Sequence, residues 1–405
     1  MRVAVIDPSL FTPTYDQEIA NALAAIGNDV RLYGKALPAR DPLTRDPLLR
    51  QHFYPGLAGR FWTRLPRSAL RVVKGVSHVE SMARLVRTLR RWSPDAIHFQ
   101  WLPLPALDLR FLPLLRRIAP LVLTVHDTMP FNGAPGSSLQ AMGFLDALRA
   151  FDHLIVHTDQ GLSRIAAHLG RSDRIARIPH GLLYEVSATR PPFRARRDDQ
   201  GRVVFLLLGM VKAYKGIDVM IRALARLAPE TRARCRVRVV GQAHMDTGPL
   251  LALARELGVA DTIDFDFRFI PDEEMVTQLD EATVLAFPYR EIEASGVLMA
   301  GIARGRPLIA SRLGAFAELV EDGRQGLLLP PGDDAALAAA LERTIAEPAL
   351  LDRITDGMEA MRAAIPPWTG IAASTVAVYE AARRHWSRSA ERPMVRAESA
   401  TPASR

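Results

Sequence analysis

Short apolar runs alternate with stretches of helical periodicity along most of the chain. The runs of the first half predict strands at residues 3–6, 30–33, 96–99, 121–125, 153–156 and 175–178. Those of the second half predict strands at residues 203–208, 237–240, 263–267, 284–287, 308–310 and 326–329. The periodic stretches between them predict helices at residues 17–26, 139–150, 161–169, 219–227, 250–257, 272–280 and 334–347. Apolar strands that alternate with helices are typical of parallel sheets covered on both faces, so the pattern predicts an α/β fold.

A polar, proline-containing stretch, residues 190–199, interrupts this alternation. We therefore expect two Rossmann-like, doubly wound domains, residues 1–190 and 200–366, for which 405 residues are sufficient. Because ligands bind at the carboxyl ends of parallel strands, the two domains are expected to face a central cleft. After two prolines, a helix is predicted over residues 367–386, returning toward the first domain. Residues 387–405 lack periodicity and are rich in Ser, Arg, Pro and Ala, which predicts a disordered tail.

The composition, with 48% hydrophobic and 24% charged residues, is typical of soluble globular proteins. The single cysteine, Cys235, excludes a disulfide framework and fits a reducing compartment, so we expect a cytoplasmic protein. The apolar run after Met1 stops at Asp7 and is too short for the core of a signal peptide. No stretch approaches about eighteen uninterrupted apolar residues, so the sequence predicts no membrane-spanning helix.

Positive charge is concentrated in the first half of the chain. Residues 1–190 carry 24 Lys and Arg against 15 Asp and Glu, whereas the remainder carries 28 against 29. Between Gly56 and Trp92, nine basic residues and one acidic residue are interleaved with apolar and aromatic ones. Such a segment is typical of a helix on an anionic membrane, here the inner face of the cell membrane; the alternative is a solvated, arginine-rich surface. We expect no nucleic-acid partner, because no recognition motif accompanies the charge.

The strongest local signal for chemistry lies in residues 203–227. A strand ends there at Gly209, a loop carries Lys212 and Lys215, and Gly216 begins a helix. Lysines at the carboxyl end of a strand, beside the N-terminus of a helix, make a phosphate site through charge and helix dipole together. The alternative is that both lysines are simply exposed in a loop.

A second signal lies in residues 284–311, after another predicted strand. Ser295, Gly296 and Val297 begin a helix that we expect to end at Gly305. A glycine lets the backbone approach a diphosphate closely, and the free N–H groups at the start of a helix can hold its charge. A glycine at a helix start is weak evidence alone, but it agrees with the first signal.

Three charged residues flank this second loop. Glu291 and Glu293 supply carboxylates that could hold sugar hydroxyls. Arg290 could pair with a phosphate or merely with its neighbours.

A third segment places His126 and Asp127 directly after an apolar strand, at the predicted cleft edge of the first domain. A histidine there can donate a hydrogen bond to a sugar or phosphate as a neutral side chain, or shuttle a proton. The alternative is a structural histidine whose hydrogen bonds are satisfied by the protein. His180, which precedes Gly181 at a strand-to-turn junction, is a weaker candidate to border the cleft.

The sequence shows no metal-binding pattern. There is no cysteine cluster and no His-Glu-x-x-His motif, and Asp264 and Asp266 fall inside a predicted strand rather than at its end. A Walker loop and a Gly-x-Ser-x-Gly elbow are also missing. We therefore expect no metal and no cofactor, and chemistry that depends on positioning and on cationic stabilisation of a leaving phosphate.

Taken together, these motifs resemble glycosyltransferase family 4, whose members have the GT-B fold of two facing Rossmann-like domains. The segment from Gly209 to Gly216 looks like the family's Gly-x5-Lys-Gly element, whose basic residues bind the donor diphosphate. Many members carry arginine directly after the first glycine; here that residue is Met210, and Lys212 is expected to supply the charge. His126 is similar to the family's histidine that contacts the transferred sugar. Two further short elements of the family resemble residues 178–181 and 313–326.

The chain departs from the family pattern at two places. The family usually has a Glu-x7-Glu pair before its Gly-x-Pro turn, and the corresponding positions here are Ile292 and Ala300. The carboxylate that usually binds the ribose is therefore missing, whereas Glu291 or Glu293 is expected to replace the first glutamate of the pair. Where many members carry two glycines in an acceptor loop, this chain has residues 8–16, which predicts unusual recognition of the acceptor.

The resemblance implies a retaining glycosyltransferase that moves a sugar from a nucleotide-diphosphate sugar to a glycan or lipid-linked glycan in polysaccharide assembly. The catalytic residues that it implies are His126, Lys215 and Glu293. The donor-binding residues are Gly209, Lys212, Lys215, Gly216, Glu291, Glu293, Ser295, Gly296 and Val297, and the acceptor-binding residues are Tyr15, Asp16 and Asp127. Two alternatives stay open: a sugar-nucleotide epimerase on the same fold, and a non-catalytic subunit that binds a nucleotide sugar, which Ala300 would favour.

Overall fold

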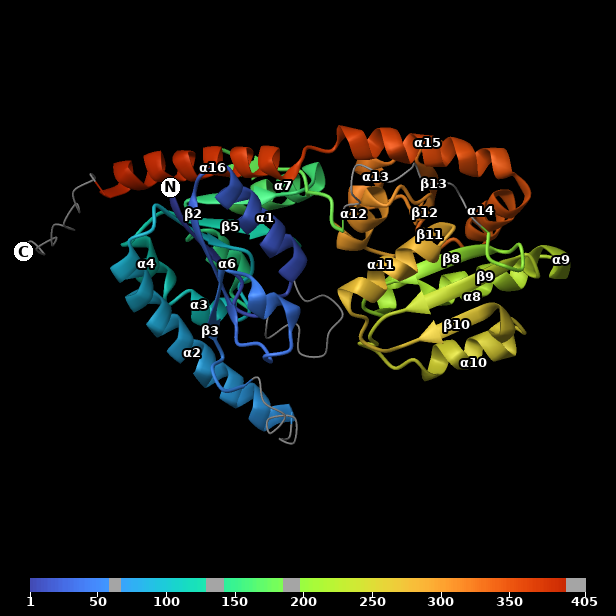
Figure 1. The fold of residues 1–405 in the computed structure, drawn as a ribbon, viewed down its shortest axis with the longest axis horizontal. Helices are drawn as coiled ribbons and strands as arrows, with labels where there is room; N and C mark the ends of the chain where they lie inside the picture. The colour runs from blue at the N-terminus through green and yellow to red at the C-terminus, as the bar shows by residue number, and fades with distance from the viewer. Residues whose placement is uncertain (58–66, 129–141, 185–196, 391–405) are drawn as a thin grey trace, which may run out of the picture.

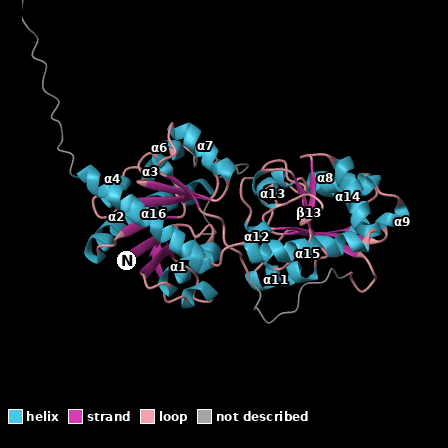
Figure 2. Ribbon diagram, turned by 90° about the horizontal axis from the view of Figure 1, so that it is seen from above, coloured by secondary structure: helices cyan, strands magenta, loops and turns pink. Residues whose placement is uncertain are grey.

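The computed structural model describes residues 1–57, 67–128, 142–184 and 197–390 of the chain. Two layered α/β units lie side by side, and the last helix of the chain runs along the first unit (Figure 1). Seen from above, helices flank the strands of each unit (Figure 2).

The first sheet has seven parallel strands in the order β3-β2-β1-β4-β5-β6-β7. These strands are β1 (Arg2–Ile6), β2 (Asp29–Lys35), β3 (Leu49–Phe53), β4 (Ala96–Phe99), β5 (Leu121–Val125), β6 (His153–Val156) and β7 (Ile175–Arg177). The described helices of this unit are α1 (Pro13–Ala25), α2 (Arg67–Trp92), α3 (Pro105–Asp108), α4 (Leu112–Arg116), α6 (Phe144–Leu148) and α7 (Asp159–Leu169). The strand order reverses between β1 and β4, so the loops after these two strands meet at the switch point of the sheet.

The second sheet has six parallel strands in the order β10-β9-β8-β11-β12-β13. These strands are β8 (Val203–Leu208), β9 (Cys235–Val240), β10 (Ile263–Asp266), β11 (Val284–Phe287), β12 (Leu308–Ser311) and β13 (Gly326–Leu329). The helices are α8 (Ile217–Arg226), α9 (Pro229–Arg232), α10 (Gly248–Glu256), α11 (Asp272–Glu281), α12 (Gly296–Ala303), α13 (Gly314–Leu319), α14 (Asp334–Ala346) and α15 (Pro348–Ala364). Here the order reverses between β8 and β11, the strands that precede the two loops with predicted phosphate chemistry.

The two doubly wound parallel sheets confirm the predicted fold, and all twelve predicted strands are present. The sequence pattern misses β3, because this strand lies at the edge of the sheet and its middle residues, Arg50, Gln51 and His52, are polar. It also misses α15, whose apolar spacing continues that of α14 with only Pro348 at the boundary.

The C-terminal helix α16 (Trp368–Ala390) packs on the first domain, along α1, β5 and β6 (Figure 1). The hydroxyl of Tyr379 lies 2.7 Å from Nδ1 of His98, and Nε1 of Trp386 donates to the carbonyl oxygen of Arg116 at 2.6 Å. These contacts join the end of the chain to the sheet that its beginning forms.

Three sequence predictions about segments need comment. The boundary at residue 386 is wrong, because α16 continues through residues 387–390, where the sequence has no helix-breaking residue. Residues 391–405 of the predicted tail and residues 190–196 of the predicted linker lie outside the described residues, as do residues 58–66 of the basic segment. None of the described helices is both long enough and apolar enough to cross a membrane.

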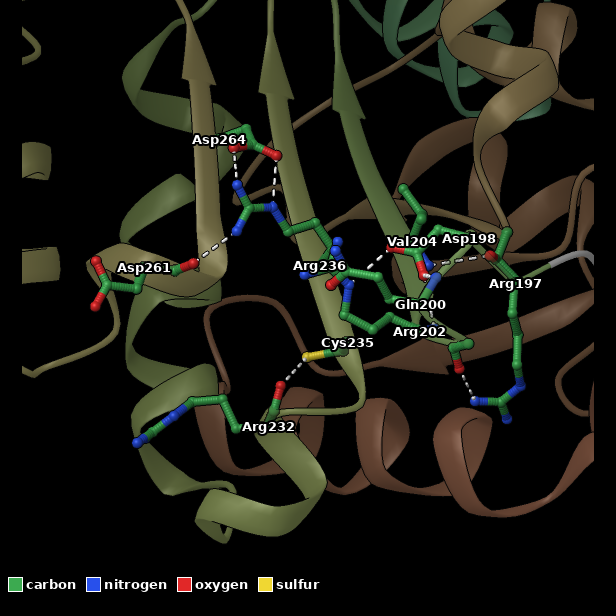
Figure 3. Close-up of polar contacts among 12 residues, drawn as sticks. Arg197, Asp198, Gln200, Arg202, Val204, Arg232, Cys235, Arg236, Asp261 and Asp264 are labelled. Carbon is green, nitrogen blue, oxygen red and sulfur yellow. Dashed lines mark hydrogen bonds and ion pairs between the residues drawn. The ribbon is translucent and has the colours of Figure 1, made fainter.

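Polar side chains link the amino-terminal ends of strands in the second sheet, away from the switch point (Figure 3). Arg236 on β9 forms a two-pronged ion pair with Asp264 on β10. Asp198 accepts hydrogen bonds from the backbone N–H groups of Gln200 at 3.0 Å and Arg202 at 2.8 Å, which closes the turn that leads into β8. These contacts brace the sheet at the edge opposite to the candidate site.

Candidate active site

The loop between β8 and α8 is shaped by two glycines with positive φ, Gly209 at 94° and Gly216 at 66°. Residues with a side chain rarely adopt this conformation. A Cβ atom on Gly216 would also lie 1.8 Å from the carbonyl oxygen of Pro288, so a larger residue would have to move the loop after β11. The loops after β8 and β11 are therefore in direct contact at the switch point.

Lys215 lies within this loop and is only 7% exposed. Its Nζ donates a hydrogen bond to the carbonyl oxygen of Leu208 at 2.8 Å and lies 5.3 Å from the centre of the Tyr289 ring. Burial, and then the neighbouring charge of Lys212, lowers the pKa of Lys215 from 10.5 to about 7. The alternative of two simply exposed lysines is therefore wrong for Lys215. An anion bound beside its amine would favour the protonated form.

Lys212 is half-buried, with its Nζ 5.9 Å from the centre of the Tyr214 ring. Burial lowers the pKa of Lys212, and the carboxylate of Asp127 acts against that shift. Because Asp127 follows β5 of the first domain, Lys212 faces that domain. Met210, which stands where many family members carry arginine, is 52% exposed and brings no charge.

The start of α12 lies against the same loop. Ser295 caps this helix, because its Oγ accepts a hydrogen bond at 3.2 Å from the backbone N–H of the third helical residue. The backbone N–H groups of Gly296 and Val297 have no acceptor inside the helix and can hold an anion. A Cβ atom on Gly209 would lie 3.1 Å from Nζ of Lys215 and 3.2 Å from Cγ2 of Val297. The structure thus brings the predicted phosphate loop and the predicted helix start together.

The exposed charged residues before α12 take separate positions. Arg290 pairs with Asp218 on α8 through both terminal nitrogens, at 2.8 and 2.6 Å. Hydrogen bonding to Asp218 raises the pKa of Arg290. Of the two alternatives for Arg290, pairing with its neighbours is the one observed. Glu291 is exposed, and its charge contributes to the raised pKa of Tyr214, which arises first from burial.

Glu293, in contrast, is buried and reaches across to the first domain. Its Oε2 accepts hydrogen bonds from the backbone N–H of Thr128, at 2.9 Å, and from the hydroxyl of Thr128. Nη1 of Arg164 lies 3.9 Å from the same carboxylate, and a Cβ atom on Gly161 would lie 2.4 Å from its Oε1. Glu293 therefore joins the loop after β11 to the loop that carries His126.

Both ring nitrogens of His126 face protein groups. Its Nε2 lies 3.1 Å from Oε1 of Gln100, and its Nδ1 lies 3.3 Å from Nε2 of His157. Nδ1 of His157 lies 3.0 Å from the carbonyl oxygen of Ile178 and must donate to it, because a carbonyl only accepts. In a neutral pair, Nδ1 of His126 therefore donates to His157, and Nε2 is satisfied when the Gln100 amide presents its NH2 group. Burial lowers the pKa of both histidines, that of His157 to about 4.

Tyr15 lies at the centre of a cluster of aromatic side chains and is 4% exposed. Its ring centre is 4.8 Å from that of His126, 4.9 Å from that of His180 and 5.1 Å from that of Trp368. Nε1 of Trp368, at the start of α16, donates to the carbonyl oxygen of Leu182 at 2.7 Å. Tyr15 thus packs where α16 re-enters the first domain, and His180 belongs to the same cluster.

Asp16 is fully buried beside Asp7 near the start of α1. Burial, and then the charge of Asp7, raises the pKa of Asp16 well above its ordinary value, and burial also raises the pKa of Asp7. Asp7 accepts hydrogen bonds from the backbone N–H groups of Ser9 at 3.0 Å, Phe11 at 2.5 Å and Thr12 at 3.3 Å. Asp16 and Tyr15 are both buried in the protein. Their role in acceptor binding stays a prediction.

Several residues of this site were not predicted as functional. Trp101 stacks on His126, with ring centres 5.3 Å apart and an interplanar angle of 13°. A small pocket at the carboxyl ends of β4 and β5 is lined by Gln100, Trp101, His126, Asp127 and Phe144, with neighbouring residues. Gln100 and Trp101 directly follow a predicted strand, so the rule that selects His126 could have found them. Thr128 had no such signal, because its partner Glu293 lies 165 positions away in the chain.

Within the described part of the chain, no group of three or more His, Cys, Asp or Glu side chains could hold a metal ion. In the Asp-x-Asp sequence of β10, Asp264 is paired with Arg236 (Figure 3), and Asp266 lies 3.1 Å from Nε of Arg268. Both carboxylates therefore serve ion pairs on the second domain.

Each half of the chain matches a known protein family. Residues 14–185 match the family described as Glycosyltransferase Family 4, and residues 202–347 match the family described as Glycosyl transferases group 1. The two matches fall on the two units of the fold.

Known proteins resemble this chain along most of its length. The D-inositol 3-phosphate glycosyltransferase of Streptomyces bingchenggensis is 28% identical over 404 residues, which cover 92% of this chain and 85% of the relative. The structure of Anabaena HepE in complex with UDP and glucose has a TM-score of 0.66 at 17% identity, over 94% of this chain and 99% of that one. The structure of WaaG, a glycosyltransferase involved in lipopolysaccharide biosynthesis, has a TM-score of 0.65 at 19% identity, over 93% and 99%. The shared architecture is the GT-B fold.

Proposed function

The chain belongs to the glycosyltransferases of family 4 and group 1, and from this premise we propose that it transfers a sugar from a nucleotide-diphosphate sugar to a glycan hydroxyl with retention of configuration. The HepE structure holds UDP and glucose, which supports a nucleotide sugar as the donor. WaaG is described as taking part in lipopolysaccharide biosynthesis, which supports a glycan or lipid-linked glycan acceptor in polysaccharide assembly.

One observation carries the proposal: Lys215, Gly209 and the first N–H groups of α12 converge at the switch point between β8 and β11. A diphosphate placed there would receive backbone hydrogen bonds from Gly296 and Val297. It would also receive positive charge from Lys215 and, on the side of the first domain, from Lys212. The reacting end of a donor sugar would then lie between the two domains.

In the proposed step, the bond between C1 of the donor sugar and the oxygen of its diphosphate breaks, and its electron pair leaves with the diphosphate. A new bond forms between C1 and the acceptor oxygen on the same face of the sugar. The acceptor's hydroxyl proton passes to an oxygen of the departing diphosphate. Lys215 and Lys212 stabilise the negative charge that develops on this leaving group, and no covalent bond between sugar and protein is required.

The roles of His126 and Glu293 follow from their contacts. Both ring nitrogens of His126 are engaged by the protein, so we assign His126 to shaping the wall against which the transferred sugar lies. Glu293 holds Thr128 and thereby places the loop after β11 against that wall. Glu291 is exposed and is therefore better placed than Glu293 to accept hydrogen bonds from sugar hydroxyls.

We also propose that transfer needs no metal, because two lysines and a helix start supply the positive charge that a divalent ion would otherwise provide. Equal rates in EDTA and in magnesium would agree with this, and a rate that returns only with magnesium would contradict it.

The proposed acceptor is lipid-linked, and the proposed location is the cytoplasmic face of the membrane. Val72, Val76 and Val79 form an exposed stripe on α2, with exposed fractions of 67%, 66% and 39%. Arg71 and Lys74 are exposed on the same turns of α2. An exposed apolar stripe on a helix that also carries exposed cations is an arrangement that binds anionic lipid surfaces.

Donor use is tested by thermal unfolding of the full chain with UDP, GDP, ADP and their sugars, because a ligand of the native state raises apparent stability. Release of the nucleotide diphosphate on addition of a membrane extract then measures transfer. Lys215→Ala is expected to lower kcat by about 10²–10³-fold, the cost of removing one charge-stabilising group, and Lys35→Ala on β2 serves as the control. Interconversion of the donor without an acceptor would indicate an epimerase. Binding without any release would indicate a non-catalytic subunit.

Membrane binding is tested by sedimentation with phosphatidylglycerol-containing vesicles. The double variant V72S/V76S is expected to lose most of the bound fraction, and Ile26→Ser, which changes a 40% exposed residue at the end of α1, should not. Equal binding of both variants would contradict the assignment of α2.

A further inference from the structure

We propose that Phe11 and Trp101 form an aromatic platform on which a pyranose ring of the acceptor stacks. This inference rests on the proposed glycosyltransferase function and assigns acceptor-contacting residues to it. The two residues follow β1 and β4, the neighbouring strands between which the order of the first sheet reverses. Loops at such a switch point are where open parallel sheets bind their ligands.

The platform is partly open to solvent. Phe11 is 45% exposed and Trp101 is partly exposed, with ring centres 5.5 Å apart at an angle of 73°. Neighbouring exposed aromatic rings at a ligand-binding edge offer an apolar contact surface to a ligand. The predicted acceptor residues Tyr15 and Asp16 lie beneath this loop, with exposed fractions of 4% and 0%. An incoming acceptor therefore contacts Phe11 and Trp101 before it can reach Tyr15 or Asp16.

The platform is held in place before any ligand arrives. Nε1 of Trp101 donates a hydrogen bond to Oγ1 of Thr12 at 3.0 Å, and one face of the indole stacks on the nearly parallel ring of His126, with ring centres 5.3 Å apart. The carboxylate of Asp7 accepts the backbone N–H groups of Phe11 and Thr12 at 2.5 and 3.3 Å. Because these contacts fix the loop, little ordering entropy is lost when a ligand stacks on it.

Polar groups adjoin the platform, as a sugar requires. Gln100, His126 and Asp127 line the same small pocket as Trp101 and Phe144. A pyranose ring has an apolar C–H face and a rim of hydroxyl groups, so it matches exposed aromatic side chains bordered by the carboxylate of Asp127. Asp127 lies close enough to Lys212 to act on its charge, which puts this pocket next to the proposed diphosphate site.

A second exposed phenylalanine allows a matched control. Phe269 is 69% exposed but lies on the second domain, in the loop between β10 and α11. Loss of stacking in Phe11→Ala should raise the acceptor KM about two- to tenfold, the range expected for one aromatic contact. Phe269→Ala should leave it unchanged, and Phe11→Tyr, which keeps the ring, should restore the wild-type value. The donor-induced thermal shift should be the same in all variants.

A second measurement is independent of turnover. Saturation-transfer NMR with methyl α- and β-glucopyranoside, galactopyranoside and mannopyranoside is expected to show ring-proton contacts in the wild-type protein and in Phe269→Ala. These contacts should be lost in Phe11→Ala. The inference is overturned if wild type and Phe11→Ala give equal signals or none. It is also overturned if n-octyl glucopyranoside shows Phe11-dependent contacts only through its alkyl chain, which would identify a lipid occupant. Absence of nucleotide release with every donor, with the ring contacts intact, would instead contradict the proposed function alone.

Discussion

The carboxylate of Glu293 on the second domain accepts two hydrogen bonds from Thr128 on the first, one from the backbone N–H at 2.9 Å and one from the hydroxyl. Glu318 makes a related contact, accepting the backbone N–H groups of Asp159 and Gln160 at 2.9 Å each, at the N-terminus of α7. Two carboxylates of the second domain thus accept hydrogen bonds from backbone N–H groups of the first domain. Hydrogen bonds to ionised groups are roughly twice as strong as neutral ones, so these contacts help to set the relative position of the domains.

We expect Thr128→Val to destabilise the protein, because it removes one hydrogen bond to the buried carboxylate of Glu293. Such bonds are worth about 1.5–3 kcal/mol. Urea unfolding at pH 7 measures the change. Thr277→Val is the matched control: its exposed hydroxyl donates to the carbonyl oxygen of Glu273 in its own helix, and its effect should stay within about 0.5 kcal/mol. Equal unfolding free energies for the two variants would contradict an energetic role for the contact.

Gly216→Ala should remove donor binding as well as stability. The substitution combines a positive φ of 66° with a Cβ atom 1.8 Å from the carbonyl oxygen of Pro288. Gly323→Ala is the control, since Gly323 has a similar φ of 79° and no atom within 4 Å of a Cβ there. The control should lose about 1–2 kcal/mol, the cost of the left-handed conformation alone, and should keep its thermal shift with UDP. If Gly216→Ala also kept the thermal shift with UDP, the conformation of the loop between β8 and α8 would not be required for donor binding.

The fold could be predicted because most of its strands are buried on both faces and show as continuous apolar runs. All six residues of β8, Val203–Leu208, are buried, and the run has the same boundaries in the sequence and in the structure. β3 could not be found in this way, because an edge strand with one face in solvent carries polar residues and gives no such run.

The site was predictable where its geometry is local. Gly209, Lys215 and Gly216 lie within one loop, so the sequence alone places them close together, and their role in binding phosphate stays a prediction. Contacts between distant segments left no pattern in the sequence. The sequence indicates Glu293 and Tyr15 as candidate ligand-binding residues, but it does not indicate their partners: Thr128 of the first domain bonds Glu293, and Trp368 from near the end of the chain packs on Tyr15.

Donor affinity should fall as the pH rises, because of Lys215. Burial lowers the pKa of this amine to about 7 in the free protein, and a bound diphosphate raises it again. Binding therefore takes up a proton above about pH 7, and the affinity for UDP should fall by up to about tenfold per pH unit. Calorimetric titrations at pH 6, 7, 8 and 8.5 in buffers of different ionisation enthalpy measure both the affinity and the proton uptake.

The matched variants separate Lys215 from its neighbour. Lys215→Arg carries a charge at every pH used and should flatten the dependence, whereas Lys212→Arg should leave it in place. A wild-type affinity that does not change between pH 6 and 8.5 would show that Lys215 is already charged in the free protein.

The buried histidines of the first domain should make it sensitive to acid. Burial lowers the pKa of His98 to about 3, of His157 to about 4 and of His180 to about 3, and also lowers that of His126. Each folded-state pKa lies below the unfolded value of 6.5, so each histidine contributes stability that is present above pH 6.5 and is lost as the pH falls toward 4. Each adds about 1.4 kcal/mol per pH unit to the slope once the unfolded chain is protonated.

Urea unfolding at pH 7, 6, 5.5 and 5 tests this slope. His98→Gln, which removes one buried imidazole that bridges Tyr379 and Thr124, should destabilise the protein at pH 7 and reduce the slope by about 1.4 kcal/mol per pH unit. His244→Gln changes an exposed histidine on the second domain and should keep the wild-type slope. The slope is the decisive quantity, because a purely structural loss in His98→Gln would shift the whole curve without tilting it. A His98→Gln curve parallel to wild type would therefore mean that His98 does not remain neutral in the folded protein over this range.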